Sequence, residues 1–257
     1  MILKGKTALV TGSTSGIGLG IALELAKQGA NIVMNGFGDV ESPKAQIAAL
    51  GVSVEYHGAD MSKPIEIEAM MRFAADKFGG VDVLVNNAGI QFVSNVEEFP
   101  AERWDAIIAI NLSSAFHTTR LAIPYMRENN WGRIVNISSV HGLVASAGKS
   151  AYVAAKHGLI GFTRSVALET ATTGITCNAI CPGWVLTPLV QKQIDDRAAR
   201  ESISVEQATK ELLQEKEPSL QFTTPEQLGG MAVFFCSPAT DNVRGQAWAS
   251  DGAWTAQ

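Results

Sequence analysis

The sequence predicts an α/β fold, a doubly wound parallel sheet of about seven strands flanked by helices. Short apolar runs alternate with longer helix-prone stretches along all 257 residues. A glycine-rich turn follows the first apolar run, and no internal repeat or low-complexity linker divides the chain. Since α/β folds of this length are often one domain, we expect residues 1–257 to form a single domain.

The first apolar run, within residues 6–11, has the continuous hydrophobicity of a buried parallel strand. A helix is expected at 16–28, and the turn before it reads Thr11-Gly12-Ser13-Thr14-Ser15-Gly16-Ile17-Gly18. Glycines let a backbone approach a ligand closely, and the free amides at a helix start attract phosphate. Strand, turn and helix together therefore predict a dinucleotide-binding unit, the alternative being a glycine-rich turn without a ligand.

The remaining elements continue the alternation. Strands are expected at 31–35, 52–57, 82–86, 132–137, 175–180 and 245–249, and helices at 42–50, 63–78, 101–129, 151–172 and 225–236. A polar, charged and helix-prone insertion at 186–223 interrupts the rhythm. It is either a solvated helical hairpin or a lid that closes over a substrate and excludes water.

Tyr152 and Lys156 are spaced to share one face of the helix expected at 151–172. A neighbouring ammonium favours the phenolate, so we expect a lowered tyrosine pKa that suits proton transfer to or from an alcohol. Ser139 ends the preceding strand and can face the same small molecule. Taken alone, a Tyr–Lys pair at this spacing is more often a solvated surface contact.

Several unlinked motifs nevertheless occur together in one order. They are Thr11-Gly12-x-x-x-Gly16-x-Gly18, Asn86-Asn87-Ala88-Gly89, Asn111, Ser139, Tyr152-x-x-x-Lys156 and Pro182-Gly183. From about residue 4 onward the chain resembles the short-chain dehydrogenase/reductase family. The resemblance implies a Rossmann-type domain, hydride transfer with a nicotinamide cofactor, the insertion as a substrate lid, and four catalytic residues, namely Asn111, Ser139, Tyr152 and Lys156.

The roles of these four follow from the same resemblance. Tyr152 removes the hydroxyl proton while Lys156 favours the phenolate and contacts the nicotinamide ribose. Ser139 orients the substrate oxygen, and Asn111 kinks its helix and holds a water that links Lys156 to solvent. A helix-surface amide is the alternative for Asn111, and the chemistry needs no metal.

The cofactor is expected to be NAD, because the 2′-phosphate of NADP needs a cation near the end of the second strand. No Lys or Arg occurs from Asn31 to Pro43. Asp39 lies beyond the usual acidic position, so Asn35 or the backbone around Gly36 and Phe37 is expected at the ribose. The cofactor residues that the resemblance implies are Gly12, Thr14, Ser15, Gly16, Ile17, Gly18, Phe37, Asp60, Met61, Asn87, Ala88, Gly89, Tyr152, Lys156, Pro182, Gly183, Val185 and Thr187. For Asp60, expected at the adenine, a plain helix cap is the alternative.

The substrate is expected to be a small carboxylate, because two potential cations, His141 and Lys149, and two amides, Gln91 and Gln193, lie on segments around the pocket. Each alone has an ordinary loop alternative. Trp184 and Leu189 are expected to crowd the apolar end of the substrate, although Trp184 also fits a core position. Ser139 and Tyr152 complete the substrate contacts. Local strings around these residues resemble family members that interconvert (R)-3-hydroxybutyrate and acetoacetate with NAD, which implies that activity.

Bulk properties exclude other classes. The net charge of −5 without a basic run argues against nucleic acid, and no apolar stretch approaches the ~18 residues of a membrane span. The N-terminal residues lead directly into the first strand, which argues against a signal peptide, so a cytoplasmic location is expected. Cys177, Cys181 and Cys236 form no close pair that would indicate a disulfide framework or a metal knuckle.

Ala253 stands where the family usually has a second glycine, and Trp254 follows it. By analogy we expect a homotetramer with D2 symmetry in which Trp254 reaches the active site of a neighbouring subunit. An NADPH-dependent 3-oxoacyl carrier-protein reductase is the nearest rival, but the basic residue it needs near the glycine turn or Asn35 is missing. A non-catalytic NAD-binding regulator would be expected to lose a catalytic residue, and none is lost.

Overall fold

A computed structural model describes residues 1–256, apart from the side chain of Leu189. Its parallel seven-stranded sheet has the order β3-β2-β1-β4-β5-β6-β7 and confirms the predicted fold class. The strands are β1 (Thr7–Val10), β2 (Asn31–Met34), β3 (Val54–Tyr56), β4 (Val83–Asn86), β5 (Gly132–Ile137), β6 (Ile175–Pro182) and β7 (Ala247–Ser250). The helices are α1 (Gly16–Lys27), α2 (Glu41–Ala48), α3 (Pro64–Phe78), α4 (Ala101–Ile108), α5 (Ser114–Glu128), α6 (Ser150–Glu169), α7 (Pro188–Glu201), α8 (Val205–Gln214) and α9 (Pro225–Phe235).

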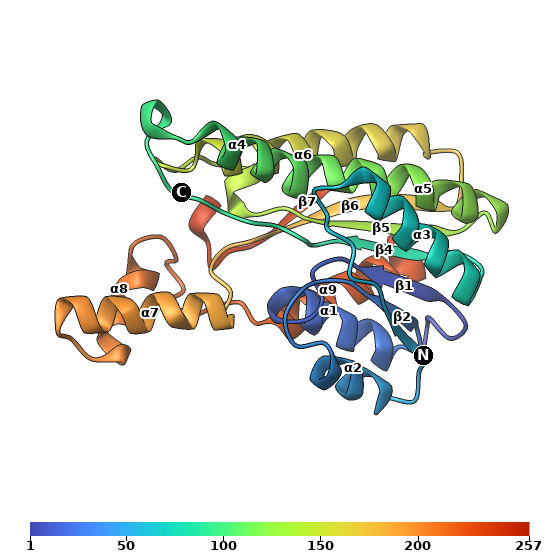
Figure 1. The fold of residues 1–257 in the computed structure, drawn as a ribbon, viewed down its shortest axis with the longest axis horizontal. Coiled ribbons are helices and arrows are strands. Elements are labelled where there is room, and N and C mark those ends of the chain that lie inside the picture. The colour runs from blue at the N-terminus through green and yellow to red at the C-terminus, as the bar shows by residue number, and fades with distance from the viewer. Residues whose placement is uncertain (257) are drawn as a thin grey trace.

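Helices cover both faces of the sheet, with α1, α2 and α9 on one side and α3, α4, α5 and α6 on the other (Figure 1). The central strands β1, β4, β5 and β6 are buried at every position, because both of their faces are covered. Alternate residues enter separate cores. Val10 packs into the core beside α1 and α9, whereas Leu9 packs into the core beside α3 and α5.

The contact between α1 and α9 is close because it is built on small residues. A Cβ on Gly20 of α1 would lie 2.8 Å from the carbonyl carbon of Pro225, the first residue of α9. That distance is shorter than side chains tolerate, so only glycine permits this approach. The capping box at Thr224 and Gln227 starts α9 at this point.

The helix predicted over 101–129 is divided by a π-helical turn at Ala109–Ser113. Asn111 lies in this turn, and its side chain exchanges two hydrogen bonds of 2.9 Å with the backbone N–H and C=O of Ile90. A π-turn is an insertion into an α-helix and is frequent at functional sites. The hydrogen bonds between Asn111 and Ile90 hold the π-helical turn in place. The surrounding sequence favours a helix throughout, so it could not reveal this turn.

The insertion forms a helical hairpin, α7 and α8, which projects from the body at the left of Figure 1. Its own small core comprises Val190, Ile194, Ala198 and Ala208. Arg197 of α7 forms ion pairs with three carboxylates, namely Glu201, Glu211 and Glu215. The hairpin is thus largely held by local packing and surface charge.

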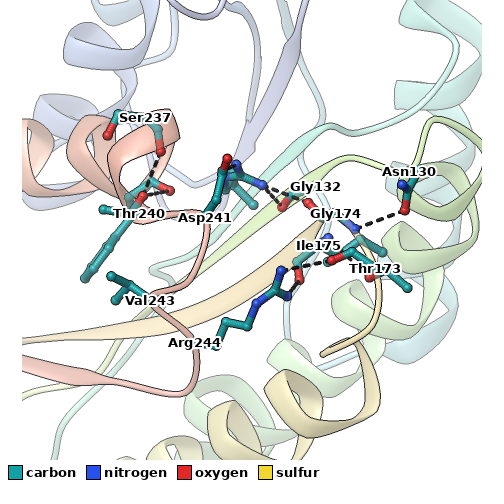
Figure 2. A network of polar contacts seen from close by, with 12 residues as sticks. Asn130, Gly132, Thr173, Gly174, Ile175, Ser237, Thr240, Asp241, Val243 and Arg244 are labelled. Carbon is teal, nitrogen blue, oxygen red and sulfur yellow. Dashed lines mark hydrogen bonds and ion pairs between the residues drawn. The ribbon is translucent and has the colours of Figure 1, made fainter.

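A charged network ties together the amino ends of β5 and β6 and the segment before β7 (Figure 2). The buried guanidinium of Arg133 donates to the carbonyls of Gly132 and Gly174 at 2.9 Å and forms an ion pair with Asp241. Arg244 donates to the carbonyl of Thr173 at 2.9 Å. These bonds hold the amino ends of the strands together. The loops that could bind a ligand follow the carboxyl ends of the strands, on the opposite side of the sheet.

In the described part of the chain, no helix is both long and apolar enough to cross a bilayer. The same residues contain no His, Cys, Asp and Glu cluster that could hold a metal ion. All three cysteines are buried thiols.

Candidate active site

Three cavities lie at the carboxyl end of the sheet. The inner pocket, about 210 Å³, is lined by Ile17, Gln91, Ser139, Val140, His141, Lys149, Tyr152, Gly183, Trp184, Val185, Thr187, Val190, Gln193 and Trp254. The central groove, about 570 Å³, is lined by Gly12, Ser15, Gly16, Ile17, Asn87, Gly89, Ile90, Gln91, Ile137, Ser138, Tyr152, Lys156, Thr187 and Pro188. The outer cleft, about 240 Å³, is lined by Gly12, Thr14, Ser15, Asn35, Gly36, Phe37, Asp60, Met61, Ala88, Gly89, Ile90 and Ile110.

The glycine turn forms the shared wall of the central groove and the outer cleft. Gly12 and Gly16 have φ of +63° and +55°, conformations that favour glycine. Asn87 donates to the carbonyls of Thr11 and Gly12 and so holds the turn against the end of β4. Ser15 makes no side-chain capping bond to the first amides of α1, so these amides can receive a phosphate.

Most of the predicted cofactor residues line one of the three cavities, and the exceptions are Gly18 and Pro182. A Cβ on Gly18 would lie 2.6 Å from Nδ2 of Asn87. Gly18 therefore lets the helix start pack beneath the turn. Pro182 ends β6 and is buried.

The side chain of Asn35 is fully engaged inside the protein, so it cannot hold a ribose as one alternative expected. It accepts from the N–H of Gly12 at 3.3 Å and donates to the carbonyls of His57 and Ala59 at 3.0 and 2.9 Å. Asp39 is exposed and accepts from the N–H of Glu41, at the start of α2. The remaining expectation is the backbone around Phe37, whose carbonyl accepts from the Thr14 hydroxyl at 2.7 Å.

Asp60 lines the outer cleft and also closes the turn before α3. Its carboxylate accepts from the backbone N–H and the hydroxyl of Ser62, and these bonds, with the nearby Lys63, hold its pKa below the usual value. The helix cap itself is Lys63, so Asp60 is not a simple cap. No Lys or Arg is among the described residues that line this cleft.

Tyr152, Lys156 and Ser139 meet where the central groove joins the inner pocket. Nζ of Lys156 lies 5.6 Å from the centroid of the Tyr152 ring and donates to the carbonyl of Ile137 at 2.7 Å. Burial lowers the pKa of Lys156 to about 8, so the ammonium is still protonated at neutral pH. The predicted juxtaposition is present.

The expected lowering of the tyrosine pKa is not found. Burial raises the pKa of Tyr152, and a hydrogen bond with Ser139 opposes that effect without cancelling it. Desolvation of the phenolate is therefore the dominant effect on Tyr152, while Nζ of Lys156 is directed to the Ile137 carbonyl. A sequence pattern gives the spacing of the two groups but not the cost of burying them.

Asn111 is buried and not a helix-surface amide. Its two bonds to Ile90 fix the segment that follows β4 and carries Gln91. A Cβ on Gly89 would lie 3.6 Å from its Oδ1, so the amide packs directly beneath the groove wall. Asn111 thus holds the backbone that lines the groove.

The predicted substrate residues converge on the inner pocket. It brings together Gln91, Ser139, His141, Lys149, Tyr152, Trp184 and Gln193, whereas the side chain of Leu189 lies outside the described structure. Lys149 is partly buried and lies over the ring of Trp184, with Nζ 5.9 Å from the centroid. Burial lowers the pKa of Lys149, which is therefore not an ordinary solvated lysine.

His141 is not the second cation that the sequence suggested. Burial lowers its pKa to about 4, with smaller contributions from nearby positive charges, so its ring is neutral at physiological pH. Its Nδ1 pairs with the Ser139 hydroxyl at 3.3 Å and its Nε2 with the Ser146 hydroxyl at 3.0 Å. His141 therefore orients Ser139 within a hydrogen-bonded chain.

Trp254 lines the inner pocket of its own chain, and its expected contact with a neighbouring subunit stays a prediction. Its ring lies 5.4 Å from that of His141, edge to face. Asp251 holds the terminal turn by accepting from the N–H and the hydroxyl of Thr255 at 2.9 and 2.6 Å. Ala253 completes this turn with φ of +72°, a conformation suited to the glycine that family members have there.

Sequence reasoning missed Glu217, which is fully buried where the segment after α8 returns to the sheet. One carboxylate oxygen accepts from the backbone N–H of Trp184. Burial, together with the negative charge of Asp251, raises the pKa of Glu217. No sequence signal distinguishes it from the exposed glutamates nearby, because its partners are distant in the chain.

Comparison with known proteins agrees with this geometry. Residues 6–198 match the model of the short chain dehydrogenase family. The chain is 67% identical to a D-beta-hydroxybutyrate dehydrogenase of Cupriavidus necator over 100% of both chains. It is 55% identical to a protein of the same name from Rhizobium meliloti, covering 98% of this chain and 99% of the relative.

Among solved structures, an actinorhodin polyketide ketoreductase with NADPH superposes with a TM-score of 0.90 at 34% identity, covering 97% of each chain. A levodione reductase also gives a TM-score of 0.90, at 30% identity and 99% coverage of each chain. The arrangement of the sheet and its helices is therefore shared with reductases that differ in substrate.

Proposed function

The chain belongs to the short-chain dehydrogenase family, whose members bind a nicotinamide cofactor, and from this premise we propose that it oxidises (R)-3-hydroxybutyrate to acetoacetate reversibly with NAD. The observation that carries the proposal is the inner pocket of about 210 Å³. Lys149 and the Tyr152 hydroxyl face this one small space, as a short hydroxy acid requires. The two relatives named D-beta-hydroxybutyrate dehydrogenase support the same substrate.

The proton chemistry falls to residues of this chain. Tyr152 takes the proton of the substrate hydroxyl, and Ser139 holds that oxygen in place while His141 orients the serine. Lys156 places a positive charge beside the phenolate that forms. Asn111 positions the backbone at Ile90, and the family resemblance gives it a further role in holding a water between Lys156 and solvent.

The central groove and the outer cleft fit a dinucleotide, because the glycine turn lines both of them and the first amides of α1 have no side-chain cap. The amides at the start of α1 would receive the pyrophosphate, Asp60 the adenine, and Lys156 the nicotinamide ribose. When bound, the nicotinamide ring supplies the acceptor for the substrate hydride. NAD is favoured over NADP because the described lining of the outer cleft has no cation for a 2′-phosphate.

The wall of the inner pocket opposite the Tyr152 hydroxyl selects the substrate. Lys149 pairs with the substrate carboxylate, and the amides of Gln91 and Gln193 donate to it. Trp184 limits the length of the chain that can enter. The hairpin of α7 and α8 carries Gln193 and acts as the lid.

A single domain, a homotetramer and a cytoplasmic location complete the proposal by family analogy. Light scattering of the purified protein at several concentrations tests the tetramer. A stable monomeric mass with full activity would contradict it.

The activity is tested by mixing the protein with (R)-3-hydroxybutyrate and NAD and following the absorbance of NADH. We expect turnover with NAD well above that with NADP, and little with the (S)-enantiomer. Turnover confined to NADPH and an acyl thioester would instead identify a 3-oxoacyl reductase. Binding of NAD without turnover of any substrate would identify a non-catalytic regulator.

A further inference from the structure

Lys216 lies where the lid returns to the sheet, two residues after the end of α8 and directly before the buried Glu217. The carboxylate of Glu217 accepts from the Trp184 N–H. The carboxylate also lies against the backbone at Gly252, where a Cβ would be 3.1 Å from Oε2. These contacts fix the backbone of residue 216 beside the inner pocket, even though the Lys216 side chain is exposed.

The side chain of Lys216 is directed toward the wall of the inner pocket. Its Nζ lies 5.8 Å from the centroid of the Trp254 ring, which is part of that wall. The charge of Lys216 also contributes to the lowered pKa values of both His141 and Lys149. Its field therefore acts across the space in which the substrate is expected.

The carboxylates next to Lys216 in sequence are engaged elsewhere. Glu215 pairs with Arg197 at 2.7 Å, and Glu217 accepts from Trp184. Within residues 1–256, neither Lys149 nor Lys216 forms an ion pair with a described carboxylate. Two uncompensated lysines around one pocket repel each other, and a small anion between them would relieve that repulsion.

We propose that Lys216 is a specificity-determining residue of the lid, which acts with Lys149 to select a carboxylate substrate over neutral alcohols. This inference rests on the proposed function, because it assigns a partner to the same substrate carboxylate. Lys149 supplies the positive charge of the pocket wall, and Lys216 supplies the charge at the base of the lid. The substrate anion thereby links the lid to the sheet, so lid closure and recognition of charge are one event.

The test compares wild type with Lys216→Gln and with Lys210→Gln, a matched control on the exposed surface of α8. Initial rates with NAD are measured for (R)-3-hydroxybutyrate and for its neutral methyl ester, at several ionic strengths. For Lys216→Gln we expect KM for the acid to rise roughly 3- to 10-fold, as for loss of one partly screened charge pair. Its kcat should stay within about twofold, with a shallower dependence of kcat/KM on salt.

The Lys210→Gln control should match wild type, Lys216→Arg should restore a low KM, and the ester should show no effect of Lys216→Gln. An unchanged KM and salt dependence in Lys216→Gln, with an active wild type, would overturn the role of Lys216. An inactive wild type would instead overturn the proposed function. In that case the rise in Tm caused by acetoacetate with NADH is compared between wild type and Lys216→Gln. An equal rise in both proteins would overturn the role of Lys216.

Discussion

The glycine-turn end of the sheet and the lid are stabilised in different ways. Beside the turn, α1 and α9 meet through Gly20, and residues such as Ile21 and Leu228 are completely buried. The lid has a small core and relies on the ion pairs of Arg197. Burial of one large apolar side chain is worth about 1.5–3 kcal/mol, but an exposed ion pair only about 0–1 kcal/mol.

This difference separates two tasks. The sheet end holds the cofactor groove and the Tyr–Lys pair in a fixed geometry, as proton and hydride transfer require. Under the proposed function, the lid would open at small cost and contribute groups that recognise the substrate. Each of the following substitutions tests this division, in which the sheet end carries proton and hydride transfer and the pocket wall near the lid selects the substrate.

The largest expected effect is that of Tyr152→Phe. Removal of the phenol hydroxyl should lower kcat by about 10²–10⁴-fold, since this hydroxyl is the group proposed to take the substrate proton. Binding of NAD, measured by fluorescence titration, should be nearly unchanged. Tyr125→Phe on α5 is the control and should behave as wild type. Near-normal turnover by Tyr152→Phe would remove the tyrosine from the mechanism.

Gly20→Ala tests the rigidity of the sheet end against Gly230→Ala on the partner helix. A methyl group at Gly20 meets the backbone of Pro225, whereas one at Gly230 meets no atom within 4 Å. Overpacking should cost about 1–3 kcal/mol in Gly20→Ala, and Gly230→Ala should gain about 0.4–1 kcal/mol. Urea unfolding measures both, and equal stabilities would show that the α1–α9 contact is not tight.

Lys149→Ala should affect substrate selection without harming the cofactor site. Loss of a charge-assisted bond to the carboxylate should raise KM for 3-hydroxybutyrate roughly tenfold or more. The dissociation constant for NAD should stay within about twofold of wild type. Lys192→Ala, an exposed lysine of α7, provides the control. If KM does not change, the lysine does not contact the substrate.

Glu217→Gln should sharpen the comparison through pH. The folded-state pKa of Glu217 is raised by burial, so the folded protein holds its proton at pH values where the unfolded chain has released it. Wild-type stability therefore falls as pH rises from the ordinary glutamate value through the raised one, and the amide variant lacks this loss. We expect the Tm of Glu217→Gln to rise relative to that of wild type as pH is raised from 4 to 8. A constant difference in Tm across that range would contradict the raised pKa of Glu217.

Much of the architecture could be predicted from the sequence, because buried parallel strands are uniformly apolar and local in pattern. The strands expected at 132–137 and 175–180 are found as Gly132–Ile137 and Ile175–Pro182. The helix expected over 101–129 was wrong in its middle, where bonds from Asn111 to Ile90 widen the turn. Helix propensity carries no information about such a distant partner.

The chemistry divides along the same line. The sequence by itself determined which groups are present, namely the glycine turn, the Tyr152–Lys156 pair and the lysine and amides for a carboxylate, because each depends on residue type and short spacing. Only the tertiary structure decided the protonation and the hydrogen-bond partners of these groups. Burial made His141 neutral and raised the Tyr152 pKa, distant carbonyls engaged Asn35, and Glu217 fixed Lys216 beside the pocket. Desolvation and long-range hydrogen bonds depend on what surrounds a group in space, and the order of residues along the chain does not specify that surrounding locally.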